Sequence, residues 1–257
     1  MELYQIDAFT DKKFSGNPAA VVPLDKWPDD SILQQIAMEN NLSDTAFFIP
    51  QDTGFHLRWF TPAVEINLCG HATLATAYVL FNILGFKNPS IRFSTLSGDL
   101  MVTVKGDLLC MDFPSWVPKP VPTLPPLLEH AIPSMIKSVL KYRDYLVELT
   151  DEEAVRLLQP DIQKLFSLGT HVIVTAEGTT CDFVSRFFAP SAGIEEDPVT
   201  GSAHSQLTPF WSERLNKKNL FARQLSKRGG ELWCEQNGER VQISGKCAFY
   251  LKGEIIL

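Results

Sequence analysis

The sequence predicts an α+β protein built from two similar halves, each rich in strands and each with one principal buried helix. Three observations predict this fold class. The segment Arg58-Trp59-Phe60-Thr61-Pro62 reappears half a chain later as Arg186-Phe187-Phe188-Ala189-Pro190. Each copy is followed by a glycine that opens an alanine-containing helix, and a proline-rich segment separates the copies. Matched landmarks in one order favour a structural duplication over two unrelated strand–loop–helix units.

The elements of the first half follow from the spacing of its apolar residues. Alternating patterns predict strands over residues 5–9, 19–24, 47–50 and 55–60. A helix is expected over residues 31–40, with Ser31 as its N-cap. A second helix is expected from about residue 70 to residue 84, because Leu74, Ala77, Tyr78 and Phe81 have helical spacing.

The segment between residues 114 and 133 is the expected boundary between two domains. It contains seven prolines, which remove backbone donors and fix φ, so it can form neither a central strand nor a long helix. The predicted domains are an N-terminal one over residues 1–116 and a C-terminal one over residues 117–257.

Composition and charge exclude several classes of protein. The 257 residues carry a net charge of −7, which argues against a nucleic-acid partner. No signal peptide and no apolar stretch of about 18 residues is found, so we expect a cytoplasmic protein without a membrane partner. The five cysteines are scattered and never spaced C-x-x-C, so neither disulfides nor a metal site is expected. Four are interpreted as buried apolar residues: Cys110, Cys181, Cys234 and Cys247.

The two matched glycine–helix junctions are the candidate binding elements. A helix N-terminus presents free N–H groups and attracts anions, which would suit a small carboxylate substrate. Titratable His71 lies at the first junction and Asp197 precedes the second, so both are candidates for acid–base chemistry. Two structural interpretations stay open, because Asp197 could complement the helix dipole and Ser202 could be an ordinary capping residue.

Four blocks of the sequence resemble the phenazine-biosynthesis PhzF-like family in order and spacing. They are GNPAAVV at residues 16–22, NLSDTAF at 41–47, LCGHAT at 68–73 and EDPVTGSA at 196–203. The resemblance extends from about residue 5 to residue 253, and the chain looks close to the animal MAWD-binding-protein-like members. It implies a diaminopimelate-epimerase-like fold: two similar, pseudo-twofold-related domains, each a curved sheet around a central helix, with the active site between them.

The same resemblance implies an isomerase that needs no metal and no organic cofactor and that often forms a homodimer. In the phenazine enzyme a carboxylate removes a proton from a ring carbon of a dihydrohydroxyanthranilate and returns it to another carbon. Carried onto this sequence, the base is Asp44 and its supporting histidine is His71. The second acidic group is Asp197, and the serine is Ser202. Backbone amides near Gly70 and Gly201 are expected to bind the substrate's carboxylate.

The sequence departs from the family pattern at Asp44, where the family usually has glutamate. The shorter side chain holds its carboxylate roughly 1–1.5 Å further back, and such a misplacement can cost about 10²-fold in rate. A non-catalytic small-molecule-binding or protein-interaction protein is therefore an alternative.

Cys69 suggests another alternative, a cysteine-assisted amino-acid epimerase. Two-thiol epimerases of this fold class need a second cysteine just before Thr200, where this chain has Val199. Cys69 is therefore interpreted as a packing residue. Asn17 either approaches the site or forms the turn of Gly16-Asn17-Pro18, and the turn is favoured. No hydrolase elbow and no nucleotide-binding glycine motif is present.

Overall fold

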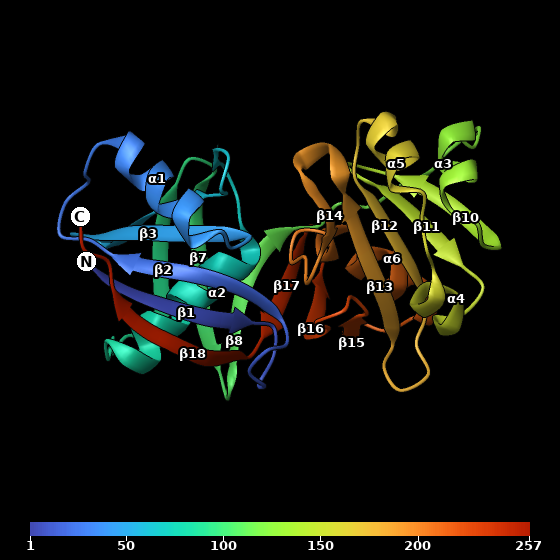
Figure 1. Cartoon of the computed structure of the whole chain (residues 1–257). Coiled ribbons are helices and arrows are strands. Elements are labelled where there is room, and N and C mark those ends of the chain that lie inside the picture. The colour runs from blue at the N-terminus through green and yellow to red at the C-terminus, as the bar shows by residue number, and fades with distance from the viewer. The chain divides into compact units, whose positions relative to one another are not determined.

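The computed structural model describes all residues from 1 to 257 and divides the chain into two compact units. Unit 1 consists of Met1–Asp112 together with Ser244–Leu257, and unit 2 consists of Phe113–Ile243. Figure 1 shows that each unit is a strand-rich body with one helix, α2 or α6, inside its sheet. None of the helices is long and apolar enough to span a bilayer.

Unit 1 is built on one strongly curved sheet. Hydrogen bonds join its main strands in the order β18-β1-β2-β3-β4-β6-β7-β8, and the short β5 pairs with the end of β4. The β2–β3 and β4–β6 pairs are parallel and the others are antiparallel. The strands are β1 (Glu2–Ala8), β2 (Asn17–Pro23), β3 (Asp44–Gln51), β4 (Gly54–Phe60), β5 (Glu65–Ile66), β6 (Ser90–Thr95), β7 (Gly98–Lys105), β8 (Leu108–Pro114) and β18 (Cys247–Glu254).

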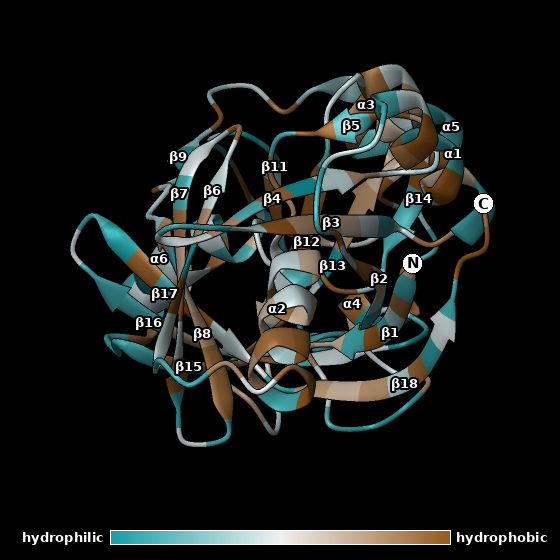
Figure 2. Ribbon diagram, turned by 90° about the vertical axis from the view of Figure 1, so that its left-hand side faces the viewer, coloured by the Kyte–Doolittle hydropathy of each residue, from teal (hydrophilic) through white to brown (hydrophobic).

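Two helical segments lie on opposite faces of this sheet. The central helix α2 (Gly70–Tyr78) continues as a π-helical turn, η1 (Val79–Ile83), and every residue from 70 to 77 is buried. Figure 2 shows α2 enclosed by the strands of unit 1. Helix α1 (Asp30–Asn40) packs on the other face through its apolar side, at Leu33 and Ile36. The helix expected over residues 70–84 is therefore confirmed.

Unit 2 repeats the strand order of unit 1. Its strands pair in the order β9-β10-β11-β12-β13-β15-β16, with parallel β11–β12 and β13–β15 pairs, and the short β14 pairs with β13. These strands are β9 (Lys119–Pro120), β10 (Ile136–Lys141), β11 (Tyr145–Leu149), β12 (Val172–Glu177), β13 (Phe183–Ala189), β14 (Ile194–Asp197), β15 (Asn219–Gln224) and β16 (Gly230–Asn237), followed by β17 (Arg240–Gly245).

The helices of unit 2 also follow the plan of unit 1. The central helix α6 (His204–Leu215) packs against β15 and β16, and its first eight residues are buried. Three short helices and a 3₁₀ turn complete the unit: α3 (Pro126–Ala131), α4 (Glu152–Leu157), α5 (Ile162–Leu168) and η2 (Pro190–Ala192). The equivalent strand order and central helix confirm two similar halves.

The repeated arginine supports the same local structure in both units. Arg58 on β4 donates from Nε to Oε1 of Glu65 on β5, at 2.7 Å. Arg186 on β13 donates in the same way to Glu196 on β14, also at 2.7 Å. Both pairs have a second bond from Nη2, so each guanidinium is held at two points by a carboxylate. Glu196 is therefore a structural partner of Arg186.

Two expectations differ from the structure and one agrees with it. The predicted C-terminal domain ran to residue 257, but β18 pairs along β1, so residues from 244 onward belong to unit 1. The proline-rich segment contains only a short edge strand and the short helix α3, which begins at a proline as helices tolerate, so the expectation of neither a central strand nor a long helix is confirmed. Ser31 lies inside α1, whose N-cap is Asp29 with no side-chain cap bond.

Candidate active site

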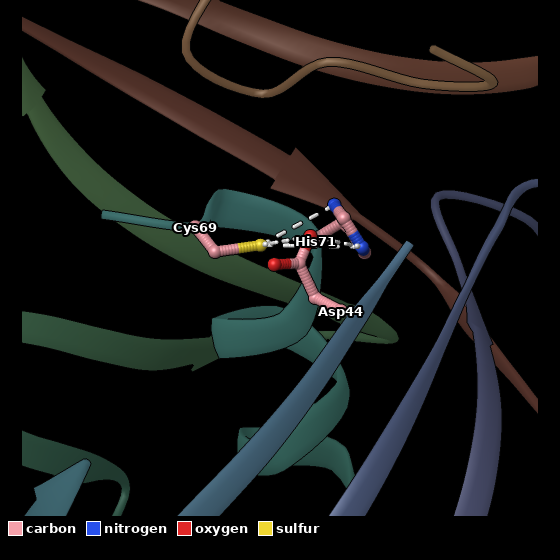
Figure 3. Close-up of side chains that lie close together, drawn as sticks. All are labelled: Asp44, Cys69 and His71. Atoms are coloured by element: carbon pink, nitrogen blue, oxygen red, sulfur yellow. Dashed lines mark hydrogen bonds and ion pairs between the residues drawn. The ribbon is translucent and has the colours of Figure 1, made fainter. Parts of the chain in front are cut away.

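Three buried side chains of unit 1 converge at the start of β3 and of α2. Asp44 is the first residue of β3, Cys69 caps α2, and His71 lies in its first turn. The Cys69 thiol donates to Asp44 Oδ2 at 3.2 Å, and His71 Nε2 lies 3.4 Å from the same oxygen. All three residues are no more than 6% exposed. Figure 3 shows their side chains pointing toward one another.

His71 is uncharged in this cluster. Burial lowers the pKa of His71 to about 3, so the imidazole is uncharged at neutral pH. The amide nitrogen of Asn17 lies 3.2 Å from Nδ1 of His71. If that amide donates, Nδ1 accepts and the ring proton is on Nε2, where it can be donated to Asp44. The pair can therefore stabilise a carboxylate at Asp44 without a second charge.

Asn17 reaches His71 because of the turn that precedes it. Gly16 has a φ of +66°, and a Cβ at this position would lie 2.2 Å from the carbonyl oxygen of Ala8. Glycine is thus required for the chain to reverse between β1 and β2. Of the two interpretations of Asn17, the approach to the site holds and the favoured one, a turn alone, was wrong, because its fully buried side chain contacts the histidine. The packing interpretation of Cys69 was likewise incomplete, since its thiol bonds to the candidate base.

In unit 2, Asp197 belongs to a buried hydrogen-bonded loop. Its Oδ2 accepts from the Thr200 hydroxyl at 2.5 Å. Gln224 on β15 donates to the backbone carbonyl of Asp197 and accepts from the backbone N–H of Thr200, at 2.8 and 2.9 Å. Asp197 is 9% exposed. The side-chain amide of Gln224 therefore fixes the backbone on either side of Pro198.

Ser202 belongs to a second group in unit 2, centred on Arg143. The guanidinium donates to Asp144 and, from Nη2, to Ser202 Oγ at 3.1 Å. It also lies over the ring of Trp116, 4.8 Å from the centroid. Gln206 of α6 accepts from the backbone N–H groups of Arg143 and Asp144. These contacts hold Arg143 in one orientation, although its side chain is 38% exposed.

Asp144 provides the buried counter-charge for this arginine. Burial alone would raise the pKa of Asp144, but hydrogen bonds from His171 and from Arg143 outweigh it, and the pKa is lowered. Asp144 is 1% exposed, and its carboxylate stays ionised at neutral pH.

The two glycines expected at helix starts differ in position. Gly70 is the first residue of α2, so its N–H has no acceptor within the helix. Gly201 lies in a turn before α6, which begins only at His204. The N–H of His204 bonds back to the Gly201 carbonyl at 3.0 Å.

Each unit therefore holds part of the predicted residue set. Asp44 and His71 are brought together in unit 1, whereas Asp197 and Ser202 lie in two hydrogen-bonded groups of unit 2. Arg143 could not be predicted from the sequence, because it belongs to no recognisable motif. A cavity of about 790 Å³ in unit 1, lined by apolar side chains such as Leu24 and Phe48, contains none of the predicted residues.

The fold defines the class of protein. A hydroxyproline epimerase structure from Agrobacterium vitis superposes with a TM-score of 0.57, covering 98% of this chain and 91% of that one. Sequence identity is 11%, so the likeness concerns the fold alone. Together with the two strand-for-strand similar units, it confirms the predicted diaminopimelate-epimerase-like α+β fold.

The particular family follows from closer relatives. Residues 6–253 match the PhzC-PhzF family model, described as phenazine biosynthesis-like protein. An uncharacterized isomerase of Pseudomonas aeruginosa is 52% identical, covering 100% of this chain and 99% of the relative. The human phenazine biosynthesis-like domain-containing protein is 38% identical, covering 99% of each. An Enterococcus faecalis PhzF-family crystal structure has a TM-score of 0.97 at 47% identity, covering 100% and 99%. The chain belongs to the phenazine biosynthesis-like PhzC-PhzF family.

Proposed function

We propose that this protein is an isomerase that moves a proton between two carbons of a small carboxylic acid, with Asp44 as the general base and without an organic cofactor. The observation that carries the proposal is the buried Asp44 carboxylate, which accepts from a thiol and faces a neutral imidazole. Relatives in Pseudomonas aeruginosa and Halalkalibacterium halodurans are named isomerases, which supports the same reaction class.

The chemistry assigned to Asp44 is a proton transfer that leaves no net change in oxidation state. One carboxylate oxygen takes a proton from a substrate carbon, and the electron pair of that C–H bond moves into the unsaturated system of the substrate. Asp44 then returns the proton to a second carbon, which completes the isomerisation. A positioned general base of this kind contributes about 10²–10⁴-fold to the rate.

His71 is assigned a supporting role at the same carboxylate. Its neutral ring can donate from Nε2 to Asp44 Oδ2, which orients the carboxylate and stabilises its charge without fixing it as an ion pair. Asn17 holds the ring from the other side through Nδ1.

In unit 2 the proposed role is recognition of the substrate's carboxylate. Arg143 and Ser202 provide a guanidinium and a hydroxyl held 3.1 Å apart, a combination that suits an anionic oxygen. Backbone N–H groups at Gly70 and Gly201 are proposed to assist. Asp197 is proposed as the second acidic group, oriented by the Thr200 hydroxyl.

The test is exchange of carbon-bound protons in D₂O, followed by mass spectrometry. Wild type would be incubated with a panel of small unsaturated and cyclic carboxylates that includes the phenazine dihydrohydroxyanthranilate. Asp44→Asn keeps the size of the side chain and removes the base, so we expect the exchange rate to fall by about 10³-fold. Asp99→Asn, an exposed aspartate of unit 1, serves as the matched control.

The Arg143→Lys variant separates substrate binding from chemistry in the same assay. Lysine cannot reproduce the planar fork of the guanidinium, so we expect KM to rise with little change in kcat. Equal exchange by wild type and Asp44→Asn would contradict the proposed base. Substrate binding without any exchange would instead favour the non-catalytic alternative.

Cysteine-assisted epimerisation is less well supported than carboxylate chemistry. The position before Thr200, where a second thiol would be needed, is Val199, which is fully buried. The Cys69 thiol donates to Asp44, a contact that supports the carboxylate. Cys69→Ser keeps a donor at this position and should therefore retain most of the exchange activity, whereas a thiol base would lose it.

A further inference from the structure

The Asp44, Cys69 and His71 cluster brings three possible metal-ligand atoms within 4.8 Å of one another. Asp44 Oδ2 is 3.2 Å from Cys69 Sγ and 3.4 Å from His71 Nε2, and the sulfur and nitrogen are 3.9 Å apart. Zinc bonds of about 2.0–2.3 Å in tetrahedral geometry place neighbouring ligand atoms roughly 3.3–3.6 Å apart. We propose that these three side chains bind one zinc-like divalent cation, and that the bound ion inhibits the enzyme.

The charges of the cluster fit such an ion. A carboxylate and a thiolate together carry two negative charges, which a divalent cation neutralises in a site where each residue is 5–6% exposed. The imidazole of His71 adds a nitrogen ligand that carries no charge when it binds a metal. Cys69 has to lose its proton to solvent when the ion binds, because the thiolate is the form that binds metals. Binding therefore releases one proton and leaves no net charge in the interior.

The kinds of ligand atom select among metals. One sulfur, one nitrogen and one oxygen suit Zn²⁺ or Co²⁺, whereas Mg²⁺ and Ca²⁺ prefer oxygen ligands alone. Three protein ligands leave a fourth position for water, as in catalytic zinc sites. All three ligands belong to unit 1 and lie at the ends of regular elements, which keeps the cluster in place.

Asn17 contacts the ring nitrogen of His71 that would not bind the metal. Its amide lies 3.2 Å from Nδ1 of His71. If Nε2 binds the metal, the ring proton moves to Nδ1, and a half-turn of the Asn17 amide presents its oxygen to accept it. Outer partners of this kind hold metal-binding histidines in orientation. Asn17 is therefore a positioning residue for the metal as well as for the base.

Inhibition follows from the identity of the bound oxygen. The carboxylate that would remove the substrate's proton is also a metal ligand, so its electron pair is occupied when the ion is present. This part of the inference rests on the proposed function, while binding of the ion does not. The two parts therefore need separate measurements.

Binding is tested by titrating the purified full chain, without an affinity tag, with Co²⁺. We expect one equivalent to produce visible bands of tetrahedral cobalt and a thiolate-to-cobalt charge-transfer band in the near ultraviolet, and Zn²⁺ to abolish both. Cys69→Ser should lose the charge-transfer band, whereas Cys234→Ser, a buried cysteine of unit 2, should retain it. Asn17→Ser should weaken binding by about 10–100-fold.

A second measurement is thermal unfolding with and without Zn²⁺. Zn²⁺ should raise the Tm of wild type and of Cys234→Ser but not that of Cys69→Ser or His71→Gln. Each variant's Tm in the absence of metal shows whether it is folded. Absence of the charge-transfer band in folded wild type, or its persistence in Cys69→Ser, would overturn the metal site.

Inhibition is measured in the D₂O exchange assay. Zn²⁺ should suppress exchange at the concentrations at which it displaces Co²⁺, and a chelator should restore it. Unchanged or faster exchange with Zn²⁺ bound would overturn the inhibitory role. If no substrate is turned over, the cobalt spectra still decide binding, so failure of the proposed function is distinguishable from failure of the metal site.

Discussion

At the scale of the residue, each unit buries one uncharged histidine at its central helix. His71 lies in the first turn of α2, and His204 opens α6 and is fully buried. Burial lowers the pKa of His204 to about 4, although a bond from Nδ1 to the Thr200 carbonyl acts in the opposite direction. A protonated ring would be desolvated at either position and would oppose the positive end of the helix dipole.

Because both histidines are buried and uncharged, we expect the folded protein to lose stability in mild acid. The unfolded state takes up protons near pH 6.5, whereas the folded state does so only near the lowered pKa of about 4, so the free energy of unfolding falls as pH drops through this window. His204→Asn should reduce that loss by about 2 kcal/mol near pH 5. Urea unfolding measured from neutral pH to about pH 4 checks this, with exposed His130→Asn as the control. Parallel profiles for wild type and His204→Asn would contradict the prediction.

At the scale of the element, the turn between β1 and β2 places Asn17 at the candidate site, and this turn depends on Gly16. Gly16 lets β2 begin with Asn17, and Asn17 in turn holds His71. The residue whose side chain orients the histidine therefore depends on a backbone conformation that only glycine adopts easily.

Gly16→Ala should lower both stability and activity. The new Cβ would meet the Ala8 carbonyl at 2.2 Å, so the turn must shift, at a cost of about 3 kcal/mol or more. Gly85→Ala is the matched control, because Gly85 also has a positive φ, of +71°, but no atom lies within 4 Å of the added Cβ. It should cost only about 1–2 kcal/mol. Chemical denaturation compares the two, and equal losses would show that the close contact is unimportant.

At the scale of the whole molecule, the chain passes from unit 1 to unit 2 and returns to unit 1, and it forms an edge strand after each passage. After leaving unit 1 it forms β9, which pairs with β10 in unit 2, and after leaving unit 2 it forms β18, which pairs with β1 in unit 1. The pair β18–β1 runs along all seven residues of β1. The last segment of the chain is therefore part of the first unit's core sheet.

Removing residues 247–257 should destabilise unit 1 selectively. The deletion leaves the hydrogen-bonding edge of β1 unpaired, so backbone amides of β1 should exchange with solvent at least about 10-fold faster. Amides of β11 and β12 in unit 2 should keep their protection. Hydrogen exchange with mass spectrometry tests this, and deletion of only the exposed Ile256 and Leu257 is the control. Equal loss of protection in both units would contradict the assignment of β18 to unit 1 alone.

The predicted homodimer also belongs to this scale and stays a prediction. Light scattering on the purified protein gives its mass in solution, and a value of about twice the 28.8 kDa of the chain would support it.

The sequence by itself determined the family, the two similar halves and the identities of Asp44 and His71 as candidates. These depend on local patterns, since a repeated motif, a glycine before a helix or a conspicuous block can be recognised without knowing what lies nearby in space. The family and the fold were confirmed by the comparisons. The reaction and the roles of the site residues stay predictions, which the variants above test.

Only the tertiary structure decided which side chains meet. Asn17, Asp44 and Cys69 are separated by 25 residues or more along the chain, and they converge because β2 and β3 pair in parallel beside the start of α2. Arg143 meets Ser202 for a similar reason, since Gln206 of α6 holds the turn before β11. Periodicity reports which face of an element is buried, but strand order and register decide its neighbours, and these arise from contacts distant in sequence.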